Sequence, residues 1–187
     1  MTVPDSPPET FSRALQSLRS ARLRPEVSCD EAPAPQRLAP FSVALTADVT
    51  VGDEEVGSGR FVVLHNPDGH EAWDGTFRVV TFARAGLEPE MAADPLVTEV
   101  GWSWLLECLD AHDLEPIASS GTVTRVASES FGAMAERPAS AEIEIRASWT
   151  PTDEALLGDH LTAWGDLLCT AAGLPPLPAG VVPLTRR

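Results

Sequence analysis

The chain has 187 residues, 43% of them hydrophobic, which is enough for one well-filled core and too few for two. Its 13 basic residues are all arginine and stand against 28 acidic residues, so the formal net charge is -15. This charge argues against general binding to nucleic acid or to an anionic membrane, because both need a basic surface.

Cysteine usage indicates a reducing compartment. Cys29, Cys108 and Cys169 are odd in number and far apart, which predicts no disulfide framework. The first nine residues lack the basic start and apolar run of a secretion signal. No segment reaches the eighteen or so uninterrupted apolar residues of a membrane span, so we expect a cytoplasmic protein.

The N-terminal part of the chain is predicted to form a helix and then a connector. Ser6 and Glu9 have the spacing of a capping box, and Phe11 and Leu18 lie on one face of the following helix. Residues 25–40 contain four prolines, which predicts an extended connector without regular structure.

Five strands are predicted from alternating apolar residues or from runs of β-branched residues. They cover residues 41–51, 58–65, 76–84, 121–128 and 141–149. The sequence NPDG at residues 66–69 predicts the turn between the second and third of these strands.

A helix predicted over residues 94–112 has two apolar faces. Trp102 and Trp104 are two residues apart, so their side chains point roughly 200° apart, and one of them must leave the core. A neighbouring protein, the connector or the C-terminal tail would each serve as a cover for the second face. We predict that a partner binds there, on these residues: Trp102, Trp104, Leu105 and Leu109.

A last helix is predicted to follow Thr150 as its cap and to stop at Gly173 in the left-handed conformation. Gly158, Gly165 and Cys169 form a stripe of small side chains, which predicts that another backbone packs closely there.

The predicted order is α-β-β-β-α-β-β-α, which indicates an α+β fold with one antiparallel sheet of about five strands and helices on one face. We expect a single domain over residues 1–187, with mobile ends at 1–5 and 179–187. The element order resembles the type III secretion chaperone-like fold. That resemblance implies a small, acidic, dimeric protein that binds extended segments of partner chains.

Several runs of residues resemble an actinobacterial family known only as a domain of unknown function, number three thousand. They are EAWDGTFR (71–78), EVGWSWL (99–105), SGTVTRVASESFG (120–132), EIRASWTP (144–151) and AWGDLLCTAAGLPPLP (163–178). The resemblance covers nearly the whole chain and implies no particular activity.

The best candidate for a polar site surrounds the turn at residues 66–69. Its side chains are His65, His70, Glu71 and Asp74. Two imidazoles and two carboxylates can hold a divalent metal or transfer a proton, but their spacing matches no established metal motif. A solvated loop is the favoured interpretation, so we predict no bound metal and no cofactor.

Three other features have a structural and a functional interpretation. Arg13, Arg19 and Arg24 form a basic patch that suits phosphate or an acidic segment, although pairing within so acidic a chain is favoured. His160 lies on an apolar face, which predicts a hydrogen-bonded core histidine. Ser130, in a loop after a predicted strand, lacks the surroundings of a nucleophile.

The leading functional interpretation is a non-enzymatic protein that acts by protein–protein contact, as a homodimer or an adaptor. One alternative is a small enzyme or metal-binding domain that uses His65 and His70. Another is a regulator of RNA processing that uses the arginine-rich first helix. The sequence identifies no small-molecule ligand.

Overall fold

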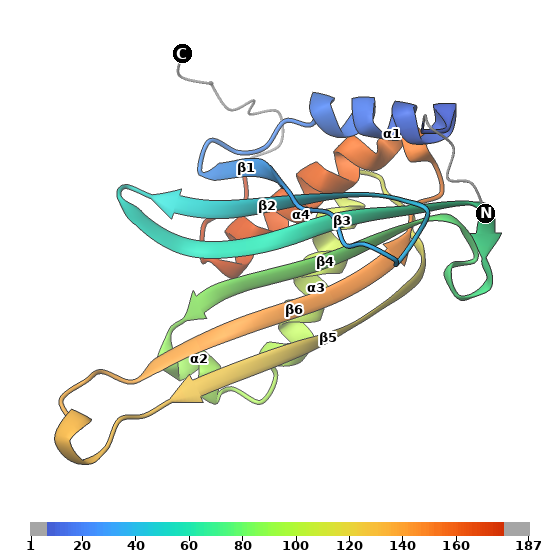
Figure 1. Cartoon of the computed structure of the whole chain (residues 1–187). Helices are drawn as coiled ribbons and strands as arrows, with labels where there is room; N and C mark the ends of the chain where they lie inside the picture. Colours follow the sequence, from blue (N-terminus) through green and yellow to red (C-terminus); the bar gives the residue numbers. More distant parts are fainter. Residues whose placement is uncertain (1–6, 178–187) are drawn as a thin grey trace.

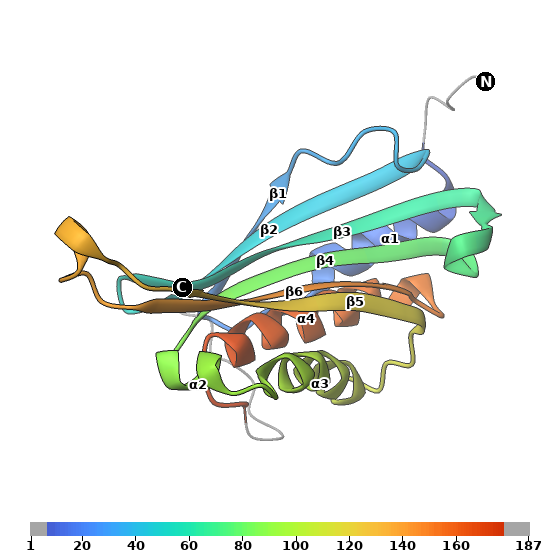
Figure 2. The same ribbon diagram turned by 90° about the horizontal axis from the view of Figure 1, so that it is seen from below.

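The computed structural model describes residues 7–177 and contains a six-stranded antiparallel sheet with helices packed on one face (Figure 1). In chain order the elements are α1 (Glu9–Ser20), β1 (Val27–Ala32), β2 (Phe41–Val51), β3 (Glu54–His70), β4 (Gly75–Leu87), α2 (Pro89–Ala93), α3 (Val97–Asp110), β5 (Ile117–Ser128), β6 (Ser140–Thr150) and α4 (Leu157–Ala171). The predicted α+β class with helices on one face is confirmed (Figure 2). Within the described residues, no helix is both long and apolar enough to cross a lipid bilayer.

The strands lie in the order β1-β2-β3-β4-β6-β5, and every neighbouring pair is antiparallel. Successive side chains of a strand point to opposite faces of the sheet, so one face can be apolar while the other is polar. In β2 the residues predicted to face inward include Ala47 and Val49, which are buried, whereas Thr46 and Asp48 are exposed. The predicted inward face is confirmed at Ala47 and Val49, whereas Val51 at the end of the strand is exposed.

β1 is a strand that the sequence did not reveal. The prediction of no regular structure over residues 25–40 is wrong at Val27–Ala32, which pairs with β2. Pro25 lies before the strand and Pro33 directly after it, so no proline removes a donor from the ladder. The sheet therefore has six strands, and the element order contains one strand more than predicted.

The core lies between the sheet and the helices α1, α3 and α4. The indole of Trp164 on α4 packs against the backbone of β3, where a Cβ on Gly59 would come within 2.6 Å of it. On the other side of α4, a Cβ on Gly158 would lie 2.4 Å from the carbonyl oxygen of Ser17 in α1. The predicted close approach of another backbone is confirmed at Gly158, where that backbone belongs to α1, whereas Gly165 faces the side chain of Leu23.

The helix ends differ in detail from the predicted ones. Thr150 is the last residue of β6 rather than a helix cap, and the side chain of Asp153 instead accepts the N–H of Ala155 at the start of a short 3₁₀ helix before α4. Gly173 has a φ of +79°, which confirms the predicted left-handed stop. The predicted capping residue Ser6 lies outside the described residues.

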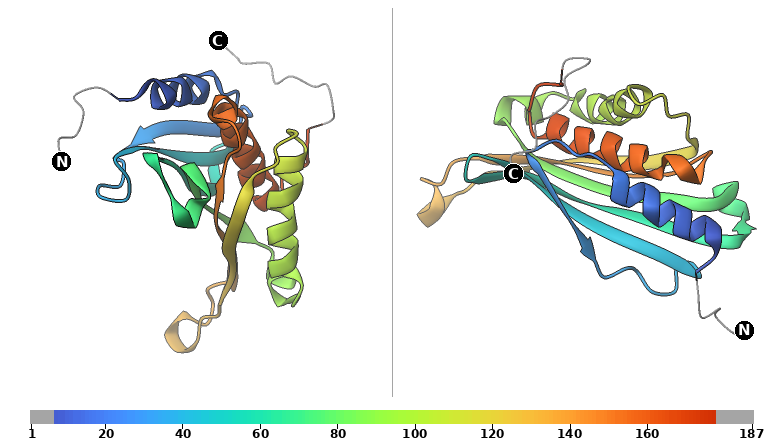
Figure 3. Two further views of the ribbon diagram at one scale, coloured as in Figure 1. Left: turned by 90° about the vertical axis from the view of Figure 1, so that its right-hand side faces the viewer. Right: turned by 90° about the horizontal axis from the view of Figure 1, so that it is seen from above.

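The sheet is strongly twisted, and α1, α3 and α4 all lie on the same side of it (Figure 3). We call the opposite side the helix-free face. Over β2 and β3 this face is covered by the chain between β1 and β2, with Ala34 and Ala39 packed against buried Ala44 and Val62.

Candidate functional site

The predicted partner surface on α3 is divided between the core and solvent. Leu105 and Leu109 are 1% and 2% exposed and pack inside the chain's own core. They are therefore not available to a partner in this structure. The apolar side chains that α3 does expose include Val100 and Leu106, which the sequence had not singled out as contacts.

The two tryptophans of α3 are both half-buried. Trp102 lies over the backbone of β5, since a Cβ on Gly121 would be 2.7 Å from its indole ring. Trp104 lines a cavity on the other side of the helix, together with Val56 and Met91. Each indole is thus partly covered by its own chain, and the assignment of either one as a partner anchor stays a prediction.

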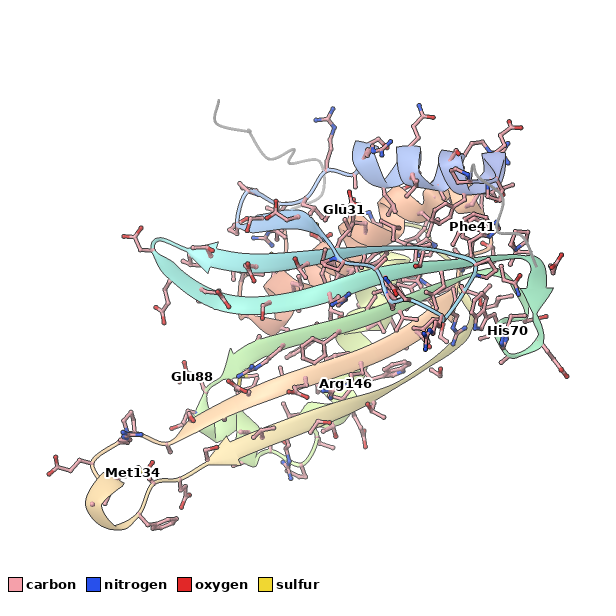
Figure 4. All side chains as sticks on the ribbon, in the orientation of Figure 1. Glu31, Phe41, His70, Glu88, Met134 and Arg146 are labelled. Atoms are coloured by element: carbon pink, nitrogen blue, oxygen red, sulfur yellow. The ribbon has the colours of Figure 1, made fainter. Side chains whose placement is uncertain are left out.

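The structure separates the side chains of the polar site predicted around residues 66–69. His65 is buried on the helix side, stacked on Phe77 at 4.1 Å between ring centroids, with its Nδ1 3.0 Å from the carbonyl oxygen of Thr76. Burial lowers the pKa of His65. His70 is exposed at the end of β3 (Figure 4), where its Nδ1 accepts the N–H of Ala72.

The two carboxylates of that site, Glu71 and Asp74, are also exposed, in the turn between β3 and β4. Because His65 is buried and His70 is exposed, the two imidazoles do not face a common site. In the part of the chain that the structure describes, no three His, Cys, Asp or Glu side chains are grouped so that they could hold a metal ion.

The basic patch predicted near the N-terminus is spread over different surroundings. Arg13 pairs with Glu154 at 2.7 Å, and Arg24 lies beyond the end of α1, buried and paired with Glu26 at 3.0 Å. Arg19 is exposed in the last turn of α1. The favoured interpretation, pairing within the chain, is present at Arg13 and Arg24.

The cysteines are free thiols and are not activated. Burial raises the pKa of Cys108 to about 12 and that of Cys169 to about 11, so both stay protonated at neutral pH. Burial also raises the pKa of Cys29. These values favour packing rather than chemistry for all three side chains.

β5 forms one edge of the sheet, and nothing else in the described chain pairs with its outer side. All of its residues are exposed except Val123, which is half-buried. The strand contains no proline, aspartate, glutamate or lysine, although such residues commonly protect an edge from pairing with another chain. Its one charged residue, Arg125, is held by the carbonyl oxygens of Ala92 and Asp94 at 3.0 and 2.7 Å.

A buried arginine lies on the helix-free face beside β5. Arg78 is 7% exposed, and its guanidinium donates to the carbonyl oxygen of Ala118 and to the hydroxyls of Ser120, Ser148 and Thr150. Burial lowers the pKa of Arg78, but a guanidinium stays protonated at neutral pH. A permanent charge is therefore held here by neutral oxygen atoms only.

Residues 7–182 match the sequence model of a family described as DUF3000, protein of unknown function. The chain belongs to the DUF3000 family. It has no significant match to a curated protein or to a solved structure. The resemblance to the type III secretion chaperone-like fold therefore stays a prediction.

Two features of this DUF3000 chain were missed in the sequence, namely the free edge of β5 and the hydroxyl-bound Arg78. Residues 121–128 were recognised as a strand, but a strand's place in the sheet depends on long-range pairing that local periodicity does not report. The alternation of β4 and β6 did place Arg78, Ser148 and Thr150 on one face, which was the signal available for the second feature.

Proposed function

We propose that the protein binds an extended segment of another polypeptide along the free edge of β5. In this mode the partner segment adds one strand to the sheet through main-chain hydrogen bonds, and side chains on alternate residues give specificity. The observation that carries the proposal is an edge strand with exposed residues and no proline or acid, which pairs regularly with β6 from Ser120 to Ser128 after an irregularity between Ile117 and Ser120.

The tip of the β5–β6 hairpin supports this proposal. It projects beyond the helices, with Met134 at its tip (Figure 4). Met134 is 50% exposed, and Phe131 in the same loop is 74% exposed. Large apolar side chains gathered on a projecting hairpin are typical of contact surfaces. A segment lying along β5 would continue over this tip and cover both side chains.

A different polypeptide suits this edge better than a second copy of the chain. Two copies would each bring a net charge of -15, and their mutual repulsion opposes association. The same charge attracts a partner that carries basic residues and raises its rate of association. We therefore expect an extended partner segment with apolar and basic side chains.

The test uses two adjacent proline substitutions near the end of β5, Val126→Pro and Ala127→Pro. Both side chains are exposed, and the two residues lie opposite Glu142 and Ala141 of β6. Backbone N–H groups of neighbouring strand residues point in opposite directions, so one proline removes a bond to β6 and the other removes only a donor at the free edge. Thermal unfolding identifies the second variant as the more stable one.

Tagged wild-type and variant chains are then used for affinity purification from the native cell, with identification of retained proteins by mass spectrometry. We expect a partner that the wild type retains and that the folded edge variant loses, because its proline ring keeps an added strand at a distance. Retention of the same partners by the folded edge variant would contradict the proposal.

A further inference from the structure

A hollow of about 690 Å³ lies on the helix-free face, where β3, β4, β6 and β5 run side by side. The hollow is shallow and open to solvent. The outward side chains that line it include Arg60, Val62, Val80, Phe82, Arg146 and Ser148. Ser120 of β5 borders the hollow, but the hollow lies on the face of the sheet, whereas the proposed polypeptide contact runs along the outer edge of that strand.

The register of the sheet places the lining in two neighbouring rows. Arg60, Phe82 and Arg146 are directly opposite one another on adjacent strands, and the guanidinium of Arg146 lies 4.9 Å from the centre of the Phe82 ring. The next row consists of Val62, Val80 and Ser148. The hollow thus has an apolar floor with arginine on two sides.

Two arginines near this hollow lack an acidic partner: Arg60 lines it and donates to the carbonyl oxygen of Pro33, and Arg78 lies behind its serines. Neither Arg60 nor Arg78 forms an ion pair with any carboxylate between residues 7 and 177. The other two arginines of the same face do, since Arg84 pairs with Glu142 and Arg146 with Glu144. Acids outnumber bases by 28 to 13 in the chain, so the excess of positive charge here is local.

The hydroxyl groups between Arg78 and the hollow are prepared to donate hydrogen bonds. Ser148 and Ser120 line the hollow, and their oxygens accept from Nη2 of Arg78 at 2.7 and 3.4 Å. A hydroxyl oxygen that accepts from a guanidinium turns its own proton away from that group. The two oxygens are 3.4 Å apart, so one proton can be used between them and the other remains for an atom in the hollow.

We infer that this hollow binds a small organic acid with an apolar body and one carboxylate. The body lies on Val80 and Phe82, and the carboxylate accepts the remaining hydroxyl proton of the Ser120 and Ser148 pair, next to the buried charge of Arg78. A metal cation is repelled by the arginines, and a large polyanion is repelled by the acidic chain around the site. A compact monoanion fits both conditions.

Isothermal titration calorimetry of the full chain tests the inference with 4-phenylbutyrate and with its uncharged amide, 4-phenylbutyramide. We expect the acid to bind at least roughly tenfold more tightly than the amide, because only the acid forms charge-assisted hydrogen bonds. Ser120→Ala and Ser148→Ala should each weaken binding of the acid by roughly tenfold. Circular dichroism shows whether each variant keeps its fold, and the two substitutions remove different groups.

Arg84→Gln is the matched control. It removes one positive charge from the same face, but Arg84 is paired with Glu142 and does not line the hollow, so binding should be unchanged. Equal binding of acid and amide, an equal loss in the control variant, or no binding of the acid up to about 10 mM would overturn the inference. Binding of a short acidic peptide but not of 4-phenylbutyrate would assign the hollow to a polypeptide and overturn it as well.

Discussion

The indole N–H of Trp149 donates a hydrogen bond to Nδ1 of His160 at 3.1 Å, and both side chains are buried. The accepting nitrogen carries no proton, so the neutral imidazole holds its proton on Nε2. Burial lowers the pKa of His160 to about 4. The bond joins the end of β6 to the first turn of α4 and confirms the predicted core histidine.

This histidine should make the protein less stable in acid. An unfolded histidine has a pKa of about 6.5, so below this pH the unfolded chain binds a proton at residue 160 that the folded chain does not bind. The free energy of unfolding should fall as pH drops from 6.5 towards about 4, by up to about 1.4 kcal/mol per pH unit. Urea unfolding across this range checks the slope, and His160→Asn should reduce it. An unchanged slope in that variant would assign the effect to other groups.

The pair of His112 and Asp166 should change the free energy of unfolding with pH in the opposite direction. Nε2 of His112 lies 2.8 Å from a carboxylate oxygen of Asp166, and the hydrogen bond that the imidazole donates to this carboxylate raises the pKa of His112. The pair contributes stability below the unfolded pKa of about 6.5 and loses it as pH rises through the folded pKa. Both side chains are partly exposed, so the effect is below about 1 kcal/mol. An NMR titration should give a raised pKa for His112 and a lower one in Asp166→Asn; equal values in both would refute the pairing.

The crossing of α1 and α4 should not tolerate a side chain at residue 158. Gly158→Ala places a Cβ 2.4 Å from the carbonyl oxygen of Ser17, and backbone atoms cannot move aside cheaply. We expect a loss of about 1–3 kcal/mol in the free energy of unfolding, as for other overpacked sites. Gly86→Ala is the control, because no atom lies within 4 Å of its Cβ and its stability should hardly change. Equal effects of the two substitutions in urea unfolding would show that the helices do not cross this closely.

Neighbouring leucines of α3 should respond very differently to truncation. Leu105 is fully buried, so Leu105→Ala should cost about 2–5 kcal/mol of stability through lost contacts and a cavity. Leu106 is 45% exposed, and Leu106→Ala should change stability by less than about 1 kcal/mol. Thermal and urea unfolding of the two variants measure the difference. Similar losses in both would mean that α3 is rotated about its axis relative to the structure.

Local patterns predicted most elements of this fold, because helix and strand periodicity are properties of neighbouring residues. β2 has the predicted bounds, and the stop of α4 at Gly173 is a local backbone requirement. β1 escaped prediction, since a six-residue strand flanked by prolines is identified only by its pairing with β2. The polar site predicted around His65 is not assembled in the structure. Closeness in sequence does not determine which face of the sheet a side chain occupies.

Local patterns along the chain are enough to indicate the α+β class, the antiparallel strands, most inward-facing residues and the core histidine of the last helix. Tertiary structure decided that β5 lies at an edge, that Leu105 and Leu109 belong to the core, and that Arg78 is bound by hydroxyl groups from β5 and β6. The physical reason is that periodicity reports how one element meets its surroundings. The order of strands and the partners of a buried charge depend on contacts between residues as far apart as 78 and 148, which only the folded chain brings together.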